Sequence, residues 1–191
     1  MKRILLASNN PGKIRELSVM LNDYEIVCPR ELGIDVEVEE TGSTFYENAL
    51  IKAKALHELS GLPTIADDSG LCVDALGGAP GVYSARYSGG GDKANNAKLL
   101  SELEGVKDRR AHFCSCLVYY DGKTVLEGTS ETYGTIAYKE EGDGGFGYDP
   151  LFISDDLNKS FGLATAEEKN SVSHRFRAIV ALKKKLLGLA D

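Results

Sequence analysis

Apolar and polar positions in the first part of the chain predict strands that alternate with helices. Lys2–Ala7 is a short apolar run and predicts a buried strand. A polar loop over Ser8–Lys13 follows, and Ile14–Leu21 has the apolar spacing of a helix. Tyr24–Cys28 predicts a second strand, whereas Ile34–Glu40 alternates apolar with acidic residues and predicts an extended segment. This order of elements is typical of α/β proteins.

Two further helices are predicted from their start signals. The spacing Thr44-x-x-Glu47 predicts a capping box that opens a helix over Phe45–Leu59. The buried face of that helix is expected to hold Phe45, Ala49, Ala53 and Leu56. Asp92 is expected to cap another helix, which runs to about Leu103.

The second half of the chain predicts a pair of long strands. Ala111–Tyr120 is largely apolar on both faces, as a central strand is. Asp121–Gly122 is a strong signal for a two-residue hairpin. Thr124–Tyr138 is then expected to return as a long strand, bent at Gly128 and Gly134.

The end of the chain predicts helices again. Thr165-x-x-Glu168 has the spacing of a second capping box, and Ser173 is expected to cap the last helix. The apolar face of this helix is expected to hold Phe176, Ile179, Val180 and Leu186. His174 and Arg175 fall in its first turn, where cations oppose the helix dipole. They form either a solvated helix start or a donor pair for a ligand oxygen.

Composition places the chain among soluble globular proteins and narrows its partners. It has 191 residues, of which 42% are hydrophobic and 27% charged, so we expect one domain over 1–191. No apolar run reaches the roughly 18 residues of a membrane span, and MKRILLASNN is expected to be a first strand, not a signal peptide. The four cysteines lack a C-x-x-C pair, so no structural zinc site is expected, and without an export signal we expect reduced cytoplasmic thiols. A net charge of −7 argues against a nucleic-acid polymer as partner.

Two adjacent acids end the predicted strand that begins at Thr64–Ala66. Asp67 and Asp68 are followed by Ser69–Gly70, which we expect to turn the chain sharply. Neighbouring side chains of a strand point to opposite faces, so the two acids are expected to have different tasks. One would face a cleft, and the other would satisfy local backbone or a basic neighbour. The alternative is a solvated acidic turn.

Lys13 stands where the first loop meets the first helix. A strand, a glycine-containing loop and a helix N-terminus can together receive a phosphate group. The full spacing of a P-loop is absent, so this is not a Walker site. The alternative is an exposed lysine in the first helical turn, which the helix dipole disfavours.

A glycine-rich segment over Gly142–Pro150 carries two aromatic residues and an acid. Its first six residues match G-x-G-x-x-G, but no helix follows, so we reject a dinucleotide-binding motif. Phe146, Tyr148 and Asp149 suit a planar heterocycle, which they can bind by stacking and hydrogen bonds. The alternative is a packed structural loop.

Taken together, five stretches of the chain resemble the inosine/xanthosine triphosphate pyrophosphatase family, and they occur in the family's order. They are SNNPGKIREL (8–17), EETGSTFYENALIKA (39–53), IADDSGLCVDALGGAPGVYSARYSG (65–89), GGFGYDPLF (144–152) and EKNSVSHR (168–175). The long central motif is the most specific of the five. In many relatives a threonine stands at the position of Ser8, and either hydroxyl can donate.

The resemblance implies a fold and a reaction. The fold would be α/β, with a long mixed β-sheet, flanking helices and two lobes around a central cleft. The reaction would be Mg²⁺-dependent hydrolysis of non-standard purine nucleoside triphosphates (ITP, dITP, XTP) to the monophosphate and pyrophosphate. A small-molecule nucleotide would be the substrate, and the protein would be a homodimer. Leu76–Tyr83 has the small and apolar residues of an interface or of a packed turn.

The resemblance also implies roles for individual residues. Asp68 would be the catalytic carboxylate and a metal ligand, and Glu40, in preference to Glu39, would be the second metal ligand. The phosphate-binding residues would be Ser8, Asn9, Asn10, Pro11, Gly12, Lys13 and Lys52. Ser69 would contact the substrate, and the base would be framed by Phe146, Gly147, Tyr148, Asp149, Lys169, His174 and Arg175.

The expected chemistry follows from these residue types. Phosphoryl transfer needs charge neutralisation more than covalent catalysis, which lysines and a cation can supply. Arg175 and His174 would donate to the C6 oxygen of the base, which adenine lacks. Two other classes remain open at this point: a nucleotide sensor without chemistry, and a metal-dependent phosphomonoesterase or nuclease.

Overall fold

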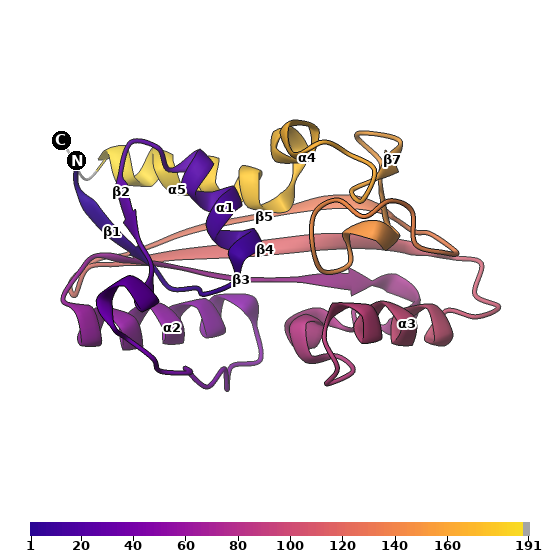
Figure 1. The fold of residues 1–191 in the computed structure, drawn as a ribbon, viewed down its shortest axis with the longest axis horizontal. Coiled ribbons are helices and arrows are strands. Elements are labelled where there is room, and N and C mark those ends of the chain that lie inside the picture. Colours follow the sequence, from indigo (N-terminus) through magenta and orange to yellow (C-terminus); the bar gives the residue numbers. More distant parts are fainter. Residues whose placement is uncertain (189–191) are drawn as a thin grey trace. The chain divides into compact units, whose positions relative to one another are not determined.

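The computed structural model describes residues 1–188, and these form an α/β fold built on a mixed sheet (Figure 1). The sheet of the described residues has seven strands in the order β2-β1-β3-β4-β5-β6-β7. They are β1 (Arg3–Leu6), β2 (Glu25–Val27), β3 (Thr64–Val73), β4 (Arg110–Tyr120), β5 (Val125–Ile136), β6 (Phe152–Ser154) and β7 (Lys159–Ser160). β1 pairs in parallel with β2 and β3, whereas β6 pairs antiparallel with β5 and β7. The predicted α/β fold with a mixed sheet is confirmed.

Helices flank these strands along the chain. The α-helices are α1 (Pro11–Met20), α2 (Phe45–Ser60), α3 (Asp92–Glu102), α4 (Ala166–Val172) and α5 (His174–Gly188). Short 3₁₀ helices are η1 (Pro29–Leu32), η2 (Asp74–Leu76), η3 (Gly81–Arg86) and η4 (Asp149–Leu151). None of the helices from residue 1 to 188 has the length and apolar character that crossing a membrane requires.

The chain divides into two compact units. The first unit holds Met1–Asp68, Ser115–Ser130 and Arg175–Asp191, and the second holds Ser69–Cys114 and Glu131–His174. Long strands therefore contribute residues to both units. The predicted arrangement of two lobes around a cleft, and the predicted single domain over 1–191, stay predictions.

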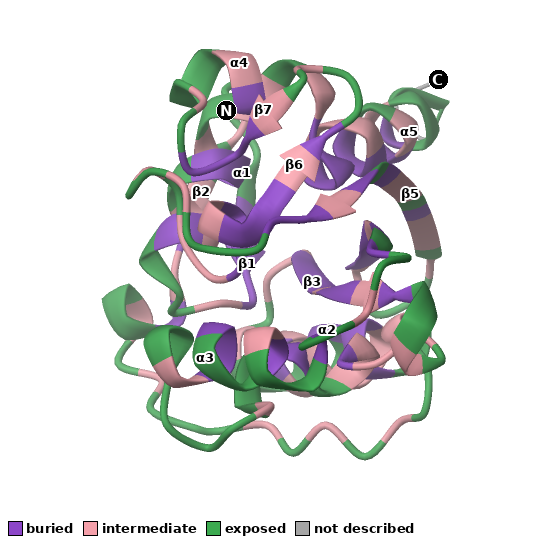
Figure 2. Cartoon of the chain, turned by 90° about the vertical axis from the view of Figure 1, so that its right-hand side faces the viewer, coloured by how far each residue is buried: buried purple, intermediate pink, exposed green. Residues whose placement is uncertain are grey.

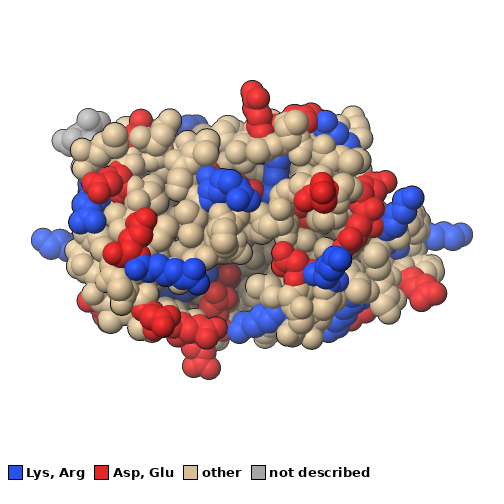
Figure 3. Space-filling view, viewed as in Figure 1, with Lys and Arg blue, Asp and Glu red and all other residues tan. Residues whose placement is uncertain are grey.

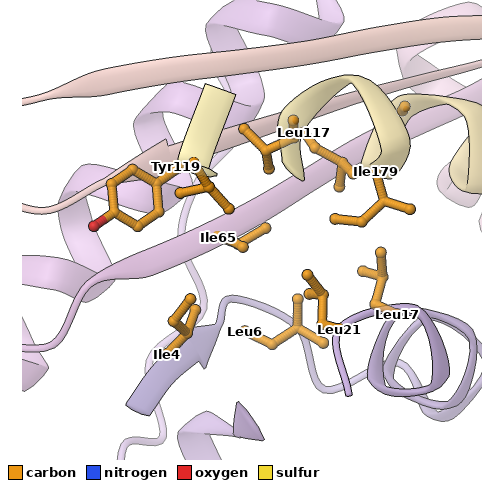
Figure 4. Packing of buried hydrophobic residues seen from close by; sticks show 11 residues of the cluster. Ile4, Leu6, Leu17, Leu21, Ile65, Leu117, Tyr119 and Ile179 are labelled. Atoms are coloured by element: carbon orange, nitrogen blue, oxygen red, sulfur yellow. The ribbon is translucent and has the colours of Figure 1, made fainter. Parts of the chain in front are cut away.

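The core of the first unit lies on both faces of β1. Ile4 and Leu6 pack in one cluster with residues of α1 and α5, and Figure 4 shows this cluster with Leu17 and Ile179. Leu5, which points to the other face, packs in a cluster with residues of α2. Figure 1 accordingly shows α1 and α5 on one side of β1 and α2 on the other. Each fully buried aliphatic side chain contributes about 1.5–3 kcal/mol, so this core fixes the strand ends that carry polar residues.

The core of the second unit is rich in aromatic residues. Phe113 lies with its ring centroid 4.5 Å from that of Phe152, and Phe152 lies 5.1 Å from Phe161. Leu99 of α3 is fully buried in the same cluster. Figure 2 shows the two sides of α3, one buried and the other exposed.

The first helix begins earlier than its apolar spacing predicts. α1 starts at Pro11, so the C-terminal half of the predicted loop is helical. The reason is local: the side chain of Asn10 accepts hydrogen bonds from the backbone N–H groups of Gly12 and Lys13, and proline is favoured at the first helical position. The prediction of a loop up to Lys13 is therefore wrong, and Lys13 lies in the first turn of α1.

The predicted turn at Ser69–Gly70 is also wrong. β3 runs without interruption from Thr64 to Val73. Leu71 and Val73 alternate into the core of the second unit, and their burial favours an extended chain over a turn. Asp67 and Asp68 thus lie in the middle of a strand and not at its end.

Other local predictions differ in detail. Thr44 caps α2 as expected, but Glu47 accepts from the N–H of Ser43, so the capping box is incomplete. The two-residue hairpin is in fact a four-residue connection, because β4 ends at Tyr120 and β5 begins at Val125. The segment Ile34–Glu40 forms no regular strand.

Predictions for the later helices were partly correct. The capping box of Thr165 and Glu168 is confirmed. Asp92 is the first residue of α3, and the N-cap is Gly91. Val180 is exposed, because α5 buries a stripe of residues spaced by one helical turn. That stripe is Ala178, Ile179, Leu182 and Leu186.

β5 passes through both glycines that the sequence marks as bends. A side chain at Gly128 would collide with the backbone of α5 at Ala178, and one at Gly134 would collide with the backbone of Ile153. These glycines therefore permit close packing against β5 within each unit.

Candidate active site

In the first unit, the carboxylate of Asp67 is a hub of charge-assisted hydrogen bonds. Its Oδ2 lies 3.1 Å from Nε of Arg175 and 3.2 Å from Nζ of Lys13. Its Oδ1 accepts from the hydroxyl of Ser115 at 3.0 Å. Asp67 is almost fully buried, and hydrogen bonds from charged donors are what make such burial tolerable. The expectation that one of the two acids satisfies a basic neighbour is confirmed for Asp67.

Arg175 connects this hub to α1. Its Nη1 donates to Oε2 of Glu16 at 2.5 Å, and the guanidinium is buried. Burial acts to lower the pKa of Arg175, but attraction by Asp67 and Glu16 outweighs it and raises that pKa above its ordinary value. The predicted hydrogen bond from Arg175 to a base stays a prediction. The structure gives its guanidinium carboxylate partners within the first unit.

A second group of charges surrounds Lys52 of α2. Its Nζ lies 3.1 Å from Oε1 of Glu40 and 3.8 Å from Oδ1 of Asp68. The same ammonium donates to the backbone carbonyl of Asp67 at 2.6 Å. Glu40, Lys52 and Asp68 lie in three different segments of the chain, and the fold brings them together.

The carboxyl group of Asp68 is buried, and it has a raised pKa and, within residues 1–188, an oxygen without a hydrogen bond. Burial raises its pKa to about 6, and the nearby Lys52 only partly opposes this shift. Oδ2 of Asp68 is buried and has no hydrogen-bond partner among the described residues. A carboxyl group with a pKa near neutrality can accept a proton under physiological conditions.

The residues that could hold Mg²⁺ are these same acids. No cluster of three or more metal-binding side chains is present in the described part of the chain. Mg²⁺ usually binds through one or two carboxylates and completes its shell with water and substrate phosphates. Glu40 and Asp68 share one ammonium, and Asp68 has an unsatisfied buried oxygen, so this pair fits such an ion.

The predicted phosphate loop lies beside a cavity of the first unit. The hydroxyl of Ser8 accepts from the N–H of Asn10 at 3.1 Å, and the side chain of Asn10 caps α1. A cavity of about 340 Å³ is lined by Ser8, Asn9 and Lys52. Burial lowers the pKa of the Lys13 ammonium, and attraction by Asp67 opposes this effect. Within the first unit, the structure thus gathers the loop, Lys13, Lys52 and both acids.

In the second unit, Lys169 and Asp149 form a buried ion pair. Nζ of Lys169 lies 2.6 Å from Oδ2 of Asp149. That oxygen also accepts from the backbone N–H of Phe146 at 3.0 Å. The ammonium of Lys169 lies 4.6 Å from the ring centroid of Phe146. The predicted base-framing residues of the glycine-rich loop and of α4 therefore contact one another.

Other predicted residues of the second unit contact residues of the same unit, and of these Tyr148 and His174 are buried. The hydroxyl of Tyr148 donates to the carbonyl of Ser84 at 2.6 Å. The ring of His174 stacks on Phe113, with centroids 4.8 Å apart and planes 15° apart. Asp92 of α3 accepts from the N–H of Gly147 at 3.0 Å. Whether these residues bind a base stays a prediction, as it does for the half-buried Ser69.

Sequence reasoning missed Glu16 and Ser115, which complete the Asp67 hub. The available signal was weak: Glu16 follows Lys13 by one helical turn, so the two share a face of α1. Ser115 was hidden in an apolar strand, where a polar residue signals a buried hydrogen bond.

One face of the molecule carries charges of both signs. On the face drawn in Figure 3, lysine and arginine are interspersed with aspartate and glutamate. A surface of this kind lacks the continuous basic stripe by which proteins bind nucleic-acid backbones.

Comparison with known proteins places this chain in a family. The model of the Ham1 family matches residues 4–185. The dITP/XTP pyrophosphatase of Treponema denticola is 47% identical over 192 residues, which cover 97% of this chain and 99% of that protein. The dITP/XTP pyrophosphatase of Haemophilus influenzae is 46% identical, with 97% and 99% covered.

Solved structures agree. The Staphylococcus aureus Ham1 protein superposes with a TM-score of 0.88 at 43% identity, covering 98% of this chain and 99% of that one. A HAM1 protein from Coxiella burnetii superposes with a TM-score of 0.87 at 38% identity, covering 98% of this chain and 100% of that one. The chain belongs to the Ham1 family, and the resemblance seen in its five sequence stretches is confirmed.

Proposed function

We propose that this protein hydrolyses non-standard purine nucleoside triphosphates, among them dITP, XTP and ITP, to the monophosphate and pyrophosphate. Relatives of nearly the same length carry the name dITP/XTP pyrophosphatase. The observation that carries the proposal is the state of Asp68: a buried carboxyl with a pKa of about 6 stands beside an ammonium within reach of the predicted phosphate loop.

Binding of the triphosphate is assigned to the first unit. Lys13 and Lys52 supply positive charge, and the N-terminus of α1 adds the positive end of the helix dipole beside the loop. Charge neutralisation of this kind lowers the barrier for attack on phosphorus. Asp68 accepts a proton from the attacking water, which its raised pKa permits near neutral pH.

Glu40 and Asp68 would hold Mg²⁺. When bound, the ion would neutralise phosphate charge and make water more acidic. Lys52 holds both carboxylates on one side, which orients them for a shared cation. The dependence on Mg²⁺ is part of this proposal.

Recognition of the base is assigned mainly to residues of the second unit, and Arg175 of the first unit is a further predicted donor. Phe146 offers a ring for stacking, and the buried pair of Asp149 and Lys169 offers fixed polar groups. His174 and Arg175 are the proposed donors to the C6 oxygen, which hypoxanthine and xanthine have and adenine lacks. Buried polar groups left unpaired by adenine would cost about 1–3 kcal/mol each.

One assay separates this function from its alternatives. Purified protein is incubated with ITP, dITP, XTP, ATP and GTP, with Mg²⁺ or with a chelator, and the products are separated. We expect the first three to give monophosphate and pyrophosphate only when Mg²⁺ is present. Release of inorganic phosphate together with the nucleoside would indicate a phosphomonoesterase, and binding without any product would indicate a sensor. Cleavage of an oligonucleotide in a parallel incubation would indicate a nuclease.

A homodimer and a cytoplasmic location complete the proposal. Tyr83 is 62% exposed at the end of Leu76–Tyr83, and an exposed aromatic residue suits an interface. Sedimentation giving a species near 20.6 kDa at micromolar concentration would contradict the dimer. The cytoplasmic location rests on the four cysteines, which form no disulfide in the described part of the chain.

A further inference from the structure

Glu16 is a buried acid within the stretch SNNPGKIREL, and the proposed chemistry gives it no role. It lies on α1, one helical turn after Lys13, and is only 7% exposed. Its carboxylate accepts from Nη1 of Arg175 at 2.5 Å. A buried carboxylate destabilises the fold unless it is paired, so the position of Glu16 needs an explanation.

The explanation lies in the balance of charge around Asp67. Oδ2 of Asp67 accepts from two cations at once, Arg175 at 3.1 Å and Lys13 at 3.2 Å. One carboxylate cannot balance two buried cations, and Glu16 supplies the second negative charge. It also divides the guanidinium: Nε of Arg175 faces Asp67, while Nη1 faces Glu16.

We propose that Glu16 is a positioning residue for the ammonium of Lys13. Guanidinium groups favour bidentate pairing with a carboxylate. Without the charge of Glu16, Arg175 would turn more of its donors to Asp67 and displace Lys13 from the shared oxygen. Lys13 would then lose the partner that holds its ammonium beside the N-terminus of α1. This inference rests on the proposed function in one respect, the binding of phosphate by Lys13.

Removing the charge of Glu16 should have two effects on anion binding, and these have opposite signs. Removing a negative charge near an anion site strengthens anion binding by simple electrostatics. Losing the position of Lys13 weakens it, because charge-assisted hydrogen bonds depend on geometry. We expect the loss of position to dominate.

The test measures binding of inorganic tripolyphosphate by isothermal titration, so that it does not depend on turnover. Glu16→Gln is compared with Glu25→Gln, which removes the same charge from an exposed ion pair of the first unit. We expect Glu16→Gln to raise Kd roughly tenfold, the size of one charge-assisted contact, and Glu25→Gln to leave it unchanged. A Kd for Glu16→Gln that is unchanged or lower would overturn the inference.

A second arm separates positioning from a general loss of structure. In a Lys13→Ala background, Glu16→Gln should change Kd less than about twofold, because the residue it positions is gone. A full tenfold change in that background would assign Glu16 a structural role and overturn the inference. If Glu16→Gln does not fold, Glu16→Asp replaces it, with a smaller weakening expected and the same dependence on Lys13.

The proposed function is tested separately in the same samples. If the parent binds tripolyphosphate but releases no pyrophosphate from ITP, the proposed function fails and the test of Glu16 stands. If the parent does not bind tripolyphosphate, Lys13 does not hold phosphate and the inference on Glu16 fails.

Discussion

Asp67 and Asp68 are neighbours in β3, yet their carboxylates belong to different groups of charges. Asp67 lies 3.1 Å from Arg175, with Lys13 on the same oxygen, whereas Asp68 lies 3.8 Å from Lys52. This follows from the alternation of a strand, which sends adjacent side chains to opposite faces. The two acids should therefore respond differently to the same chemical change.

Asp68→Asn should fold normally and lose most activity. An amide cannot accept a proton and is a poorer metal ligand, so we expect a loss of about 10²–10⁴-fold in kcat. Pyrophosphate release from ITP with saturating Mg²⁺ measures it. Turnover close to that of the parent would remove Asp68 from the mechanism.

The main effect of Asp67→Asn should be a lower free energy of unfolding, with a smaller effect on activity. The substitution leaves the buried cations Lys13 and Arg175 with less negative charge, and breaking a buried pair costs about 3–5 kcal/mol. Urea unfolding measures the free energy of unfolding, with the exposed pair variant Glu25→Gln as control. A change below about 1 kcal/mol, the value typical of a surface pair, would show that the hub contributes little.

The raised pKa of Asp68 predicts how stability depends on pH in metal-free protein. The folded pKa of about 6 lies above the ordinary aspartate value of 3.8, so the folded state binds this proton more tightly. Ionisation of Asp68 therefore destabilises the fold progressively as pH rises from about 4 to above 6. Asp68→Asn removes this penalty, and we expect it to gain about 1–3 kcal/mol over the parent at pH 8.

The measurement is the free energy of unfolding of parent and variant across that pH range, in the presence of a chelator. The difference should be small near pH 4 and largest above pH 7. A difference that does not change with pH, or that favours the parent at high pH, would mean that the pKa of Asp68 is not raised. Added Mg²⁺ should stabilise the parent and leave Asp68→Asn nearly unaffected.

Lys13→Ala and Lys52→Ala should each weaken tripolyphosphate binding. A charge-assisted contact to phosphate is worth about 1.5–3 kcal/mol, and two contacts to one phosphate chain should be non-additive. Lys54→Ala is the matched control, because Lys54 is an exposed lysine on the same helix as Lys52. Unchanged affinity in both site variants would remove the two lysines from the phosphate site.

Some of these structural features could be predicted from the sequence, and others could not. The positions of the strands β1 and β2 and of the helices of the first unit along the chain follow from apolar spacing, because burial imposes that spacing on each element. The start of α1 could have been placed from Asn10 and Pro11, which are strong N-terminal signals. The course of β3 through Ser69–Gly70 could not have been predicted from the sequence. Turn propensity depends on neighbouring residues, whereas the cores that hold this strand extended are formed by residues distant in the sequence.

The pairing of charges was beyond the sequence for a similar reason. Lys13, Glu16, Asp67 and Arg175 lie in three separate segments of the chain. The position of His174 and Arg175 in the first helical turn left a solvated helix start or a donor pair open, and the family resemblance suggested Arg175 as a ligand for the base. Only the fold shows that two carboxylates of the first unit already engage it.

The last prediction concerns Asp149, whose carboxylate organises the glycine-rich loop of the second unit. Oδ2 accepts from the N–H of Phe146 and from the ammonium of Lys169, so one oxygen fixes both the loop and a buried cation. Asp149→Asn should weaken both contacts. We expect KM for ITP to rise about tenfold or more, since a lost charge-assisted hydrogen bond costs roughly 1.5–3 kcal/mol.

Glu168→Gln is the control, because Glu168 also forms an ion pair of 2.6 Å in the second unit, with Lys159, but its side chain is 37% exposed. Surface pairs contribute about 0–1 kcal/mol, so its KM should hardly change. Tripolyphosphate lacks a base, and its Kd should be the same in Asp149→Asn and the parent. If tripolyphosphate binding fell as much as ITP binding, Asp149 would serve the fold as a whole, and the assignment of base recognition to this loop would be wrong.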